Sequence, residues 1–256
     1  MLAEIAIAGP SDDAAAAYGR GDYATALRLL RPLADHGDAP SQFNLGLMYD
    51  HGRGVARDDA EAARWYRSAA DQGLALAQTN LGTLYETGRG VPKDEIEAVK
   101  WYRKATAQDA AAQNNLGGMY ERGRGVGKDY AEAARWYRRA ADRGYAPAQN
   151  NLGSLYQRGE GVWQDYPEAL KWYRKGADQG QASAQYNLAN MYVGGLGVPQ
   201  DYVEAHKWFD LAASRFSVSQ ADKRELAVKS RGEVAARMTQ AQLAEAQKRA
   251  REWKPK

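Results

Sequence analysis

A Trp-Tyr pair, Trp-Phe in its last copy, returns along this chain at steps of 36, 35, 36 and 36 residues. Its copies begin at Trp65, Trp101, Trp136, Trp172 and Trp208. One leucine keeps the same steps, at Leu45, Leu81, Leu116, Leu152 and Leu188, and so does one glycine, at Gly52, Gly88, Gly123, Gly159 and Gly195. Three markers in phase over five copies predict a tandem array of one small repeated unit.

Each unit is predicted to form two helices joined by a glycine loop. In residues 75–108, apolar side chains fall at helical spacing in two runs separated by "GRGVPKD". They are Ala77, Leu81, Leu84 and Tyr85, then Ala98, Trp101, Tyr102 and Ala105. Gly82 leaves room for another helix to approach closely. Asp94 stands three residues before Glu97, which predicts a capping box at the start of the second helix. The same pair recurs as Asp58/Glu61, Asp129/Glu132, Asp165/Glu168 and Asp201/Glu204.

The loop glycines could cradle a phosphate, because a glycine-rich turn before a helix presents unpaired backbone amides. We interpret them instead as a structural corner. Gly88 fits a left-handed helix C-cap, Gly90 allows a tight return, and Val91 can fold back as an apolar plug. The acidic cap at Asp94 would repel an anion, and the Gly-Lys-Ser/Thr sequence of a phosphate loop is missing.

Composition gives no indication of an enzyme. The chain has 256 residues, no cysteine and a net charge of +3, so no thiolate metal site or disulfide is available. No Ser-x-x-Lys or Gly-x-Ser-x-Gly sequence occurs. His36, His51 and His206 lack metal-ligand spacing, and we expect each of them at the surface. We therefore expect no catalytic residue, no metal and no cofactor.

The unit "AQTNLGTLYETGRGVPKDEIEAVKWYRKA" resembles a Sel1-like repeat, a relative of the tetratricopeptide repeat with a longer loop. The resemblance implies an all-α fold, a right-handed α-solenoid of helix-turn-helix repeats. We divide the chain into an N-terminal extension (1–10), a short tetratricopeptide-like first repeat (11–38), five Sel1-like repeats (39–218), and C-terminal capping helices with a tail (219–256). A capping box at Thr239 and Gln242 starts the last helix, and Lys254 to Lys256 are expected to fray.

The resemblance also implies a function. Proteins of this type, mostly bacterial, are non-enzymatic adaptors or scaffolds that bind a protein or an extended peptide in the groove of the solenoid. The alternative is an exported β-lactamase-like or peptidoglycan-related envelope protein, although such relatives are rich in cysteine. The location would be the periplasm or outside the cell if a signal peptide has been removed, and otherwise the cytoplasm. We expect no nucleic-acid partner and no membrane-spanning segment, and oligomeric state stays open.

One asparagine precedes each repeat leucine, and in tetratricopeptide relatives an asparagine before Leu-Gly clamps a peptide. The candidate row is Asn44, Asn80, Asn115, Asn151 and Asn187, with the neighbours Phe43, Asn114, Asn150, Tyr186 and Asn190. The alternative is that these amides bond within the array and hold one repeat to the next. A glutamine row, Gln42, Gln78, Gln113, Gln149 and Gln185, and the Trp and Tyr rows are expected to be structural. The loop arginines Arg53, Arg89 and Arg124 could make weak contacts with an acidic partner.

Overall fold

The computed structural model describes residues 12–256, so the predicted N-terminal extension lies outside the described residues. The described part is entirely helical, and it divides into two compact units between Lys128 and Asp129. The first unit contains α1 (Asp12–Gly19), α2 (Tyr23–Asp35), α3 (Ala39–His51), α4 (Asp59–Asp71), α5 (Ala75–Thr87), α6 (Glu95–Ala105) and α7 (Ala110–Arg122). The second contains α8 (Tyr130–Asp142), α9 (Ala146–Arg158), α10 (Tyr166–Asp178), α11 (Ala182–Gly194), α12 (Tyr202–Arg215), the 3-10 turn η1 (Val218–Gln220), α13 (Ala221–Ala235) and α14 (Gln240–Glu252).

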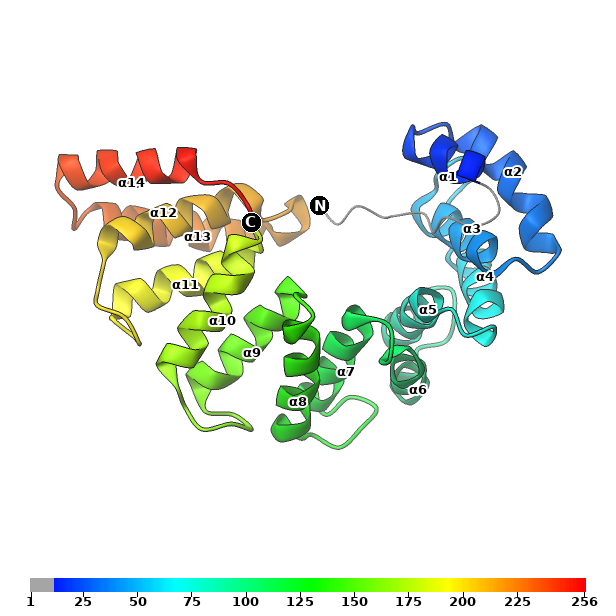
Figure 1. The fold of residues 1–256 in the computed structure, drawn as a ribbon, viewed down its shortest axis with the longest axis horizontal. Helices are drawn as coiled ribbons and strands as arrows, with labels where there is room; N and C mark the ends of the chain where they lie inside the picture. The colour runs from blue at the N-terminus through cyan, green and yellow to red at the C-terminus, as the bar shows by residue number, and fades with distance from the viewer. Residues whose placement is uncertain (1–11) are drawn as a thin grey trace. The chain divides into compact units, whose positions relative to one another are not determined.

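The predicted all-α class and the tandem helix-turn-helix organisation are confirmed. Each repeat supplies an odd-numbered helix, its first, and an even-numbered helix, its second, from α3 to α12. From α1 to α7 and from α8 to α13, consecutive α-helices pack side by side, as α11 and α12 do (Figure 1). Buried leucine, tyrosine, alanine and methionine side chains fill the space between them. The fold is therefore an array of small repeats, each of which needs its neighbours to bury an apolar face.

The second helices begin at aspartate caps, but the predicted capping boxes are only half formed. Asp94 Oδ1 accepts hydrogen bonds from the backbone amides of Ile96 and Glu97, at 3.0 and 2.9 Å. The Glu97 side chain does not return to the cap, because the Asp94 amide already donates to the Tyr85 carbonyl at 2.9 Å. Glu97 pairs with Lys100 instead, at 2.9 Å. Thr239 and Gln242 do form the complete box that was predicted for α14.

The loop glycines are confirmed as structural corners. Gly88 ends α5 in the left-handed conformation, with φ at 72°. Gly90, with φ at 67°, lies so close to the start of α4 that an added Cβ would stand 1.9 Å from the Asp59 carbonyl oxygen. Gly125 meets Glu95 in the same way, at 2.1 Å. Each loop therefore packs on the second helix of the preceding repeat, where only glycine fits.

Tyrosine and glutamine side chains complete the contacts between helices. The Tyr102 ring packs on Gly82, where an added Cβ would lie 2.8 Å from it, so the close approach predicted at this glycine is confirmed. Gln78 Nε2 donates to the Ala70 carbonyl at 3.0 Å, which ties α5 to the end of α4. The other glutamines of the row bond to a backbone carbonyl at the end of the preceding helix in the same manner. The glutamine row is thus structural, as predicted.

The C-terminal helices close the second unit by packing on α12. Trp253 stacks edge-on against Trp208, with ring centroids 6.1 Å apart. The expectation of a frayed terminus is wrong, because the Lys256 amide donates to the Asp178 carbonyl at 2.9 Å. The tail therefore returns to α10 instead of extending into solvent.

Candidate partner-binding surface

In the first unit, the predicted row is covered at one end and half-buried along the rest. Phe43 and Asn44 are only 4 and 3 % exposed, and the Phe43 ring packs on Tyr66 with centroids 5.7 Å apart. A side chain that binds a partner has to be accessible, and these two are buried in the core. They are therefore not part of a binding surface in this structure. Asn80, Asn114 and Asn115 are half-buried on α5 and α7.

In the second unit, the amides of the row bond to one another. Asn187 Nδ2 on α11 donates to Asn150 Oδ1 on α9 at 2.9 Å, and Asn150 Nδ2 donates to Asn151 Oδ1 at 3.2 Å. Asn190 Nδ2 donates to the Tyr186 carbonyl of its own helix at 3.1 Å. The row thus links one repeat to the next, which is the structural alternative left open by the sequence. A side-chain amide has two donor hydrogens and two acceptor lone pairs, so an asparagine in one of these bonds has capacity for a further bond to a ligand.

A pocket of about 290 Å³ opens on this part of the second unit. Its lining combines three predicted residues with four that the repeat pattern did not indicate. The predicted ones are Asn150, Tyr186 and Asn187, and the others are Ser183, Phe216, Lys223 and Leu226. Phe216 follows α12, and Lys223 and Leu226 belong to α13, outside the repeats. The pocket thus has a polar amide pair, aromatic and aliphatic walls and one exposed cation.

Tyr186 and Leu226 give this pocket its apolar surface. The Tyr186 ring is held against Phe209 of α12, with centroids 5.3 Å apart. Leu226 is 47 % exposed, although it is a large apolar side chain. A preformed aromatic wall beside an exposed leucine and two polar amides is the usual composition of a small binding site.

The loop arginines already have partners within the array, which leaves less capacity for the expected contacts with an acidic partner. Arg53 donates to the Tyr18 hydroxyl at 2.6 Å, and Arg89 and Arg124 form ion pairs. Arg89 bonds to Asp59, with 2.7 Å between Nη2 and Oδ1, and also to Asp50. Hydrogen bonding to Arg89, with Arg57 contributing, lowers the pKa of Asp59 from 3.8 to about 2. Arg124 pairs with Glu95 at 2.8 Å in the same geometry. These arginines therefore join successive repeats.

The part of the chain that the structure describes shows neither a cluster of metal-binding side chains nor a helix that could span a membrane. Residues 12–256 contain no cluster of three or more His, Asp or Glu side chains that could hold a metal ion. None of the helices described has the length and apolar character needed to cross a bilayer. Two of the histidines, His36 and His51, are exposed as expected. His206 is the exception, since it is buried at 4 % exposure.

Tandem helix pairs with a capped second helix and a glycine corner define an α-helical repeat protein of the solenoid class. The Sel1 repeat family model matches residues 39–74, 75–109, 110–145, 146–181 and 182–215. The chain therefore belongs to the Sel1 repeat family, and the predicted resemblance is confirmed. No curated protein matches the chain.

Solved structures give the same fold. A Sel1 repeat protein from Oxalobacter formigenes is 33 % identical with a TM-score of 0.76, and the match covers 88 % of this chain and 97 % of that one. A protective antigen of uropathogenic Escherichia coli with an SLR fold is 39 % identical with a TM-score of 0.71, covering 79 % of this chain and 44 % of that one. The chain thus spans less than half of the E. coli protein. An immunity protein from Pseudomonas aeruginosa, 21 % identical with a TM-score of 0.57, covers 81 % of this chain and 84 % of its own length and shares the fold.

Proposed function

We propose that this protein is a non-enzymatic interaction scaffold, and that the pocket around Asn150 and Asn187 binds an extended segment of a partner protein. Sel1 repeat folds are in general protein-interaction folds, which supports the general role. The observation that carries the specific proposal is the pocket itself, where the amide pair adjoins the Tyr186 ring.

The amide pair suits a peptide backbone better than a particular side chain. One hydrogen bond joins Asn187 to Asn150, and each amide keeps further donor or acceptor capacity. A backbone presents one amide and one carbonyl in nearly every residue, so a paired amide can bind segments of different sequence. Preference among segments would then come from Tyr186 and Leu226, which favour an apolar side chain, and from Lys223, which favours a carboxylate beside it.

Photo-crosslinking tests this placement. Peptides are first selected on the intact protein from a displayed library of random linear sequences. A benzoylphenylalanine replacing Ser183, which lines the pocket, is expected to crosslink the selected peptide. The same group replacing Lys171 serves as the control, because that side chain is 55 % exposed on α10 and does not line the pocket. Crosslinking from position 171 and not from 183 would contradict the proposal.

Affinity measurements extend the test to the chemistry of the site. Asn187→Ala should weaken the selected peptide by about 0.5–1.5 kcal/mol if one neutral hydrogen bond is lost. Lys223→Ala should weaken peptides that carry an acidic residue and leave neutral peptides unchanged, and the loss should shrink as salt is added. Equal affinities for parent and both variants would rule out this pocket as the binding site.

A further inference from the structure

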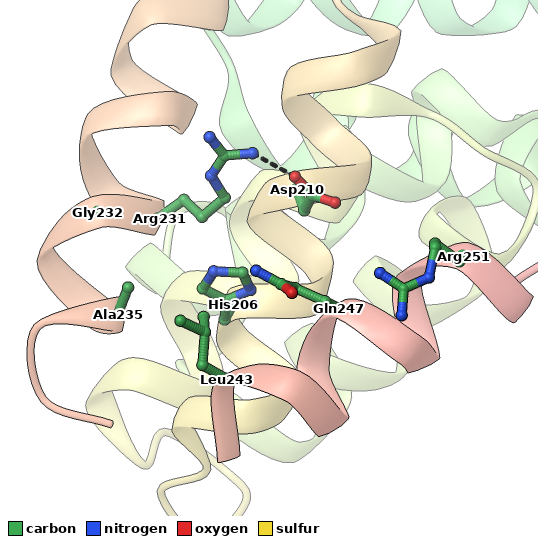
Figure 2. A pocket seen from close by; sticks show the side chains of 8 residues that line it. All are labelled: His206, Asp210, Arg231, Gly232, Ala235, Leu243, Gln247 and Arg251. Atoms are coloured by element: carbon green, nitrogen blue, oxygen red, sulfur yellow. Dashed lines mark hydrogen bonds and ion pairs between the residues drawn. The ribbon is translucent and has the colours of Figure 1, made fainter. Parts of the chain in front are cut away.

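A second pocket of about 490 Å³ lies between α12, α13 and α14, and it shares no lining residue with the pocket around Asn150. Figure 2 shows His206 among the side chains that α13 contributes on one side and α14 on the other. The lining residues are His206, Asp210, Arg231, Gly232, Ala235, Leu243, Gln247 and Arg251. Apart from the first two, they come from outside the repeats.

His206 stands where the preceding repeats carry apolar residues. Counted from the aspartate cap, its position is that of Ala63, Val99, Ala134 and Leu170. The expectation of a solvated histidine is therefore wrong, because the side chains at this register position are buried or half-buried in the other repeats too. The His206 side chain is 4 % exposed, and its Nδ1 has no hydrogen-bond partner within the described residues. Less than 1 Å² of this atom is accessible, so a molecule in the pocket meets the rest of the ring and not Nδ1.

The charged side chains that line this pocket carry a net charge that would be balanced by one negative charge on a ligand. Arg231 of α13 is paired with Asp210 of α12, so these two cancel. Arg251 of α14 lines the pocket and makes no ion pair within the described residues. Burial, assisted by Arg231 and opposed by Asp210, lowers the pKa of His206, so the imidazole is neutral near pH 7. The net charge of the pocket is thus one positive, and the Asp210 carboxylate disfavours a dianion.

The remaining surface is apolar and suits a short hydrocarbon chain. Leu243 and Ala235 border the pocket beside His206 (Figure 2), and Gly232 adds no side chain. Gln247 of α14 adds an amide to the lining. A guanidinium can hold a carboxylate through two parallel hydrogen bonds, and a side-chain amide can donate a further one.

We propose that this pocket binds a carboxylate group carried on a short aliphatic chain. The Arg251 guanidinium holds the carboxylate, the Gln247 amide donates to it, and the aliphatic chain lies against Leu243, Ala235 and the His206 ring. The chain terminus of a partner and a free carboxylic acid offer the same chemistry. This inference does not depend on the function proposed for the other pocket.

Titration of the full chain with N-acetyl-leucine and with its amide tests the proposal. We expect the acid to bind and the amide to bind at least about tenfold more weakly, as the loss of a charged hydrogen-bond partner implies. Arg251→Gln should weaken the acid by a similar factor. Lys248→Gln is the matched control, since Lys248 is an exposed cation of the same helix and lies outside the pocket, and it should change nothing.

Three outcomes would overturn the proposal: no binding of either compound at millimolar concentration, equal binding of both, or an unchanged affinity in a folded Arg251→Gln variant. The nitrogen resonance of the His206 ring gives an independent readout, because the ring lines the pocket, and it should move when the acid is added. A bound acid that leaves this resonance unchanged would place the ligand elsewhere and contradict the assignment.

A peptide ending in leucine with a free carboxylate distinguishes the two sources of the ligand. If it binds more tightly than N-acetyl-leucine, the natural ligand is the C-terminus of a protein. If the two bind equally, the ligand is a small carboxylic acid, and both results support the pocket. A peptide that binds equally well when its terminus is amidated would contradict it.

Discussion

The guanidinium carbon of Arg67 lies 5.5 Å from the centroid of the Trp101 ring and 5.5 Å from that of Tyr85. The same guanidinium donates to the Tyr85 hydroxyl. Arg174 repeats the arrangement over Trp208 and Tyr192, again at 5.5 Å from each centroid. An arginine that follows one Trp-Tyr pair thus packs on the aromatic side chains of the next repeat. The Trp row therefore helps to hold successive repeats together.

Arg67→Lys should lower the free energy of unfolding by about 0.5–1 kcal/mol, because an ammonium cannot stack on Trp101 while bonding to Tyr85. Chemical denaturation of the full chain measures this change. Arg64→Lys is the control on the same helix, since the Arg64 side chain is 76 % exposed and pairs with the nearby Glu61. A loss equal to that of the control would show that the stacked arginine adds nothing.

Three glycines of the first unit should rank in stability according to conformation and contact. Gly90→Ala combines a φ of +67° with a Cβ only 1.9 Å from the Asp59 carbonyl oxygen, so it should cost more than about 2 kcal/mol. Gly73→Ala has a positive φ but open space around it, and about 1 kcal/mol is expected. Gly127→Ala has neither problem and should be neutral or slightly stabilising. Thermal melting of the three variants tests the order, and a Gly90 variant no less stable than the Gly73 variant would contradict the packed corner.

The Arg89–Asp59 pair should contribute stability that acid removes. The folded pKa of Asp59 is about 2, below its ordinary 3.8, so the contribution is present above pH 3.8 and is lost as the pH falls towards 2. Arg89→Gln should remove about 1 kcal/mol near neutral pH, since Arg89 is 35 % exposed and solvent screens the pair. Its effect should be much smaller at pH 2, where half of the folded molecules still carry the Asp59 carboxylate, and should vanish below that pH. Arg57→Gln, which removes the more exposed partner of Asp59, should cost less, and denaturation curves at both pH values test the pair of variants.

His206 should make the protein less stable as the medium becomes acidic. Burial lowers its folded pKa below the ordinary 6.5, while Asp210 opposes and Arg231 assists that shift, and Arg251 lines the same pocket. The unfolded chain therefore takes up the proton first, and stability falls as the pH drops below about 6.5. His206→Leu, which restores the residue type of Leu170, should flatten that slope. The exposed His51→Gln is the control, and an unchanged slope in the His206 variant would contradict the buried neutral imidazole.

The repeated features of the fold could be predicted because each recurs in phase with the others. Asp94, Gly88 and Gly82 each have a local conformational or packing role that the sequence spacing indicates, and the structure confirms those roles. The Trp-Tyr-Arg run was equally periodic, and it could have indicated the arginine stacks. The capping box predicted at Glu97 does not form because the Asp94 amide, its intended donor, already donates to the Tyr85 carbonyl.

Sites built from non-repeated residues could not be predicted in this way. Phe216, Lys223 and Leu226 complete the first pocket from segments with no counterpart in the repeats. His206 occupies a repeat position with a residue type that no other copy has. Histidines are usually exposed, so the sequence predicted a surface position, whereas His206 is buried. Both pockets therefore lie where the periodic pattern ends, and only tertiary packing brings their residues together.

The most direct test of the scaffold role is a paired measurement of melting temperature and peptide affinity for the Asn150→Ala/Asn187→Ala variant. The double variant removes both partners of the 2.9 Å bond, and Asn151, which loses the donor from Asn150, is only half-buried. The melting temperature should therefore change little. Affinity for the selected peptide should fall by about tenfold or more, while Lys171→Ala keeps the parent value. A variant that melts at a clearly lower temperature, and whose folded molecules bind the peptide with the parent affinity, would contradict the account.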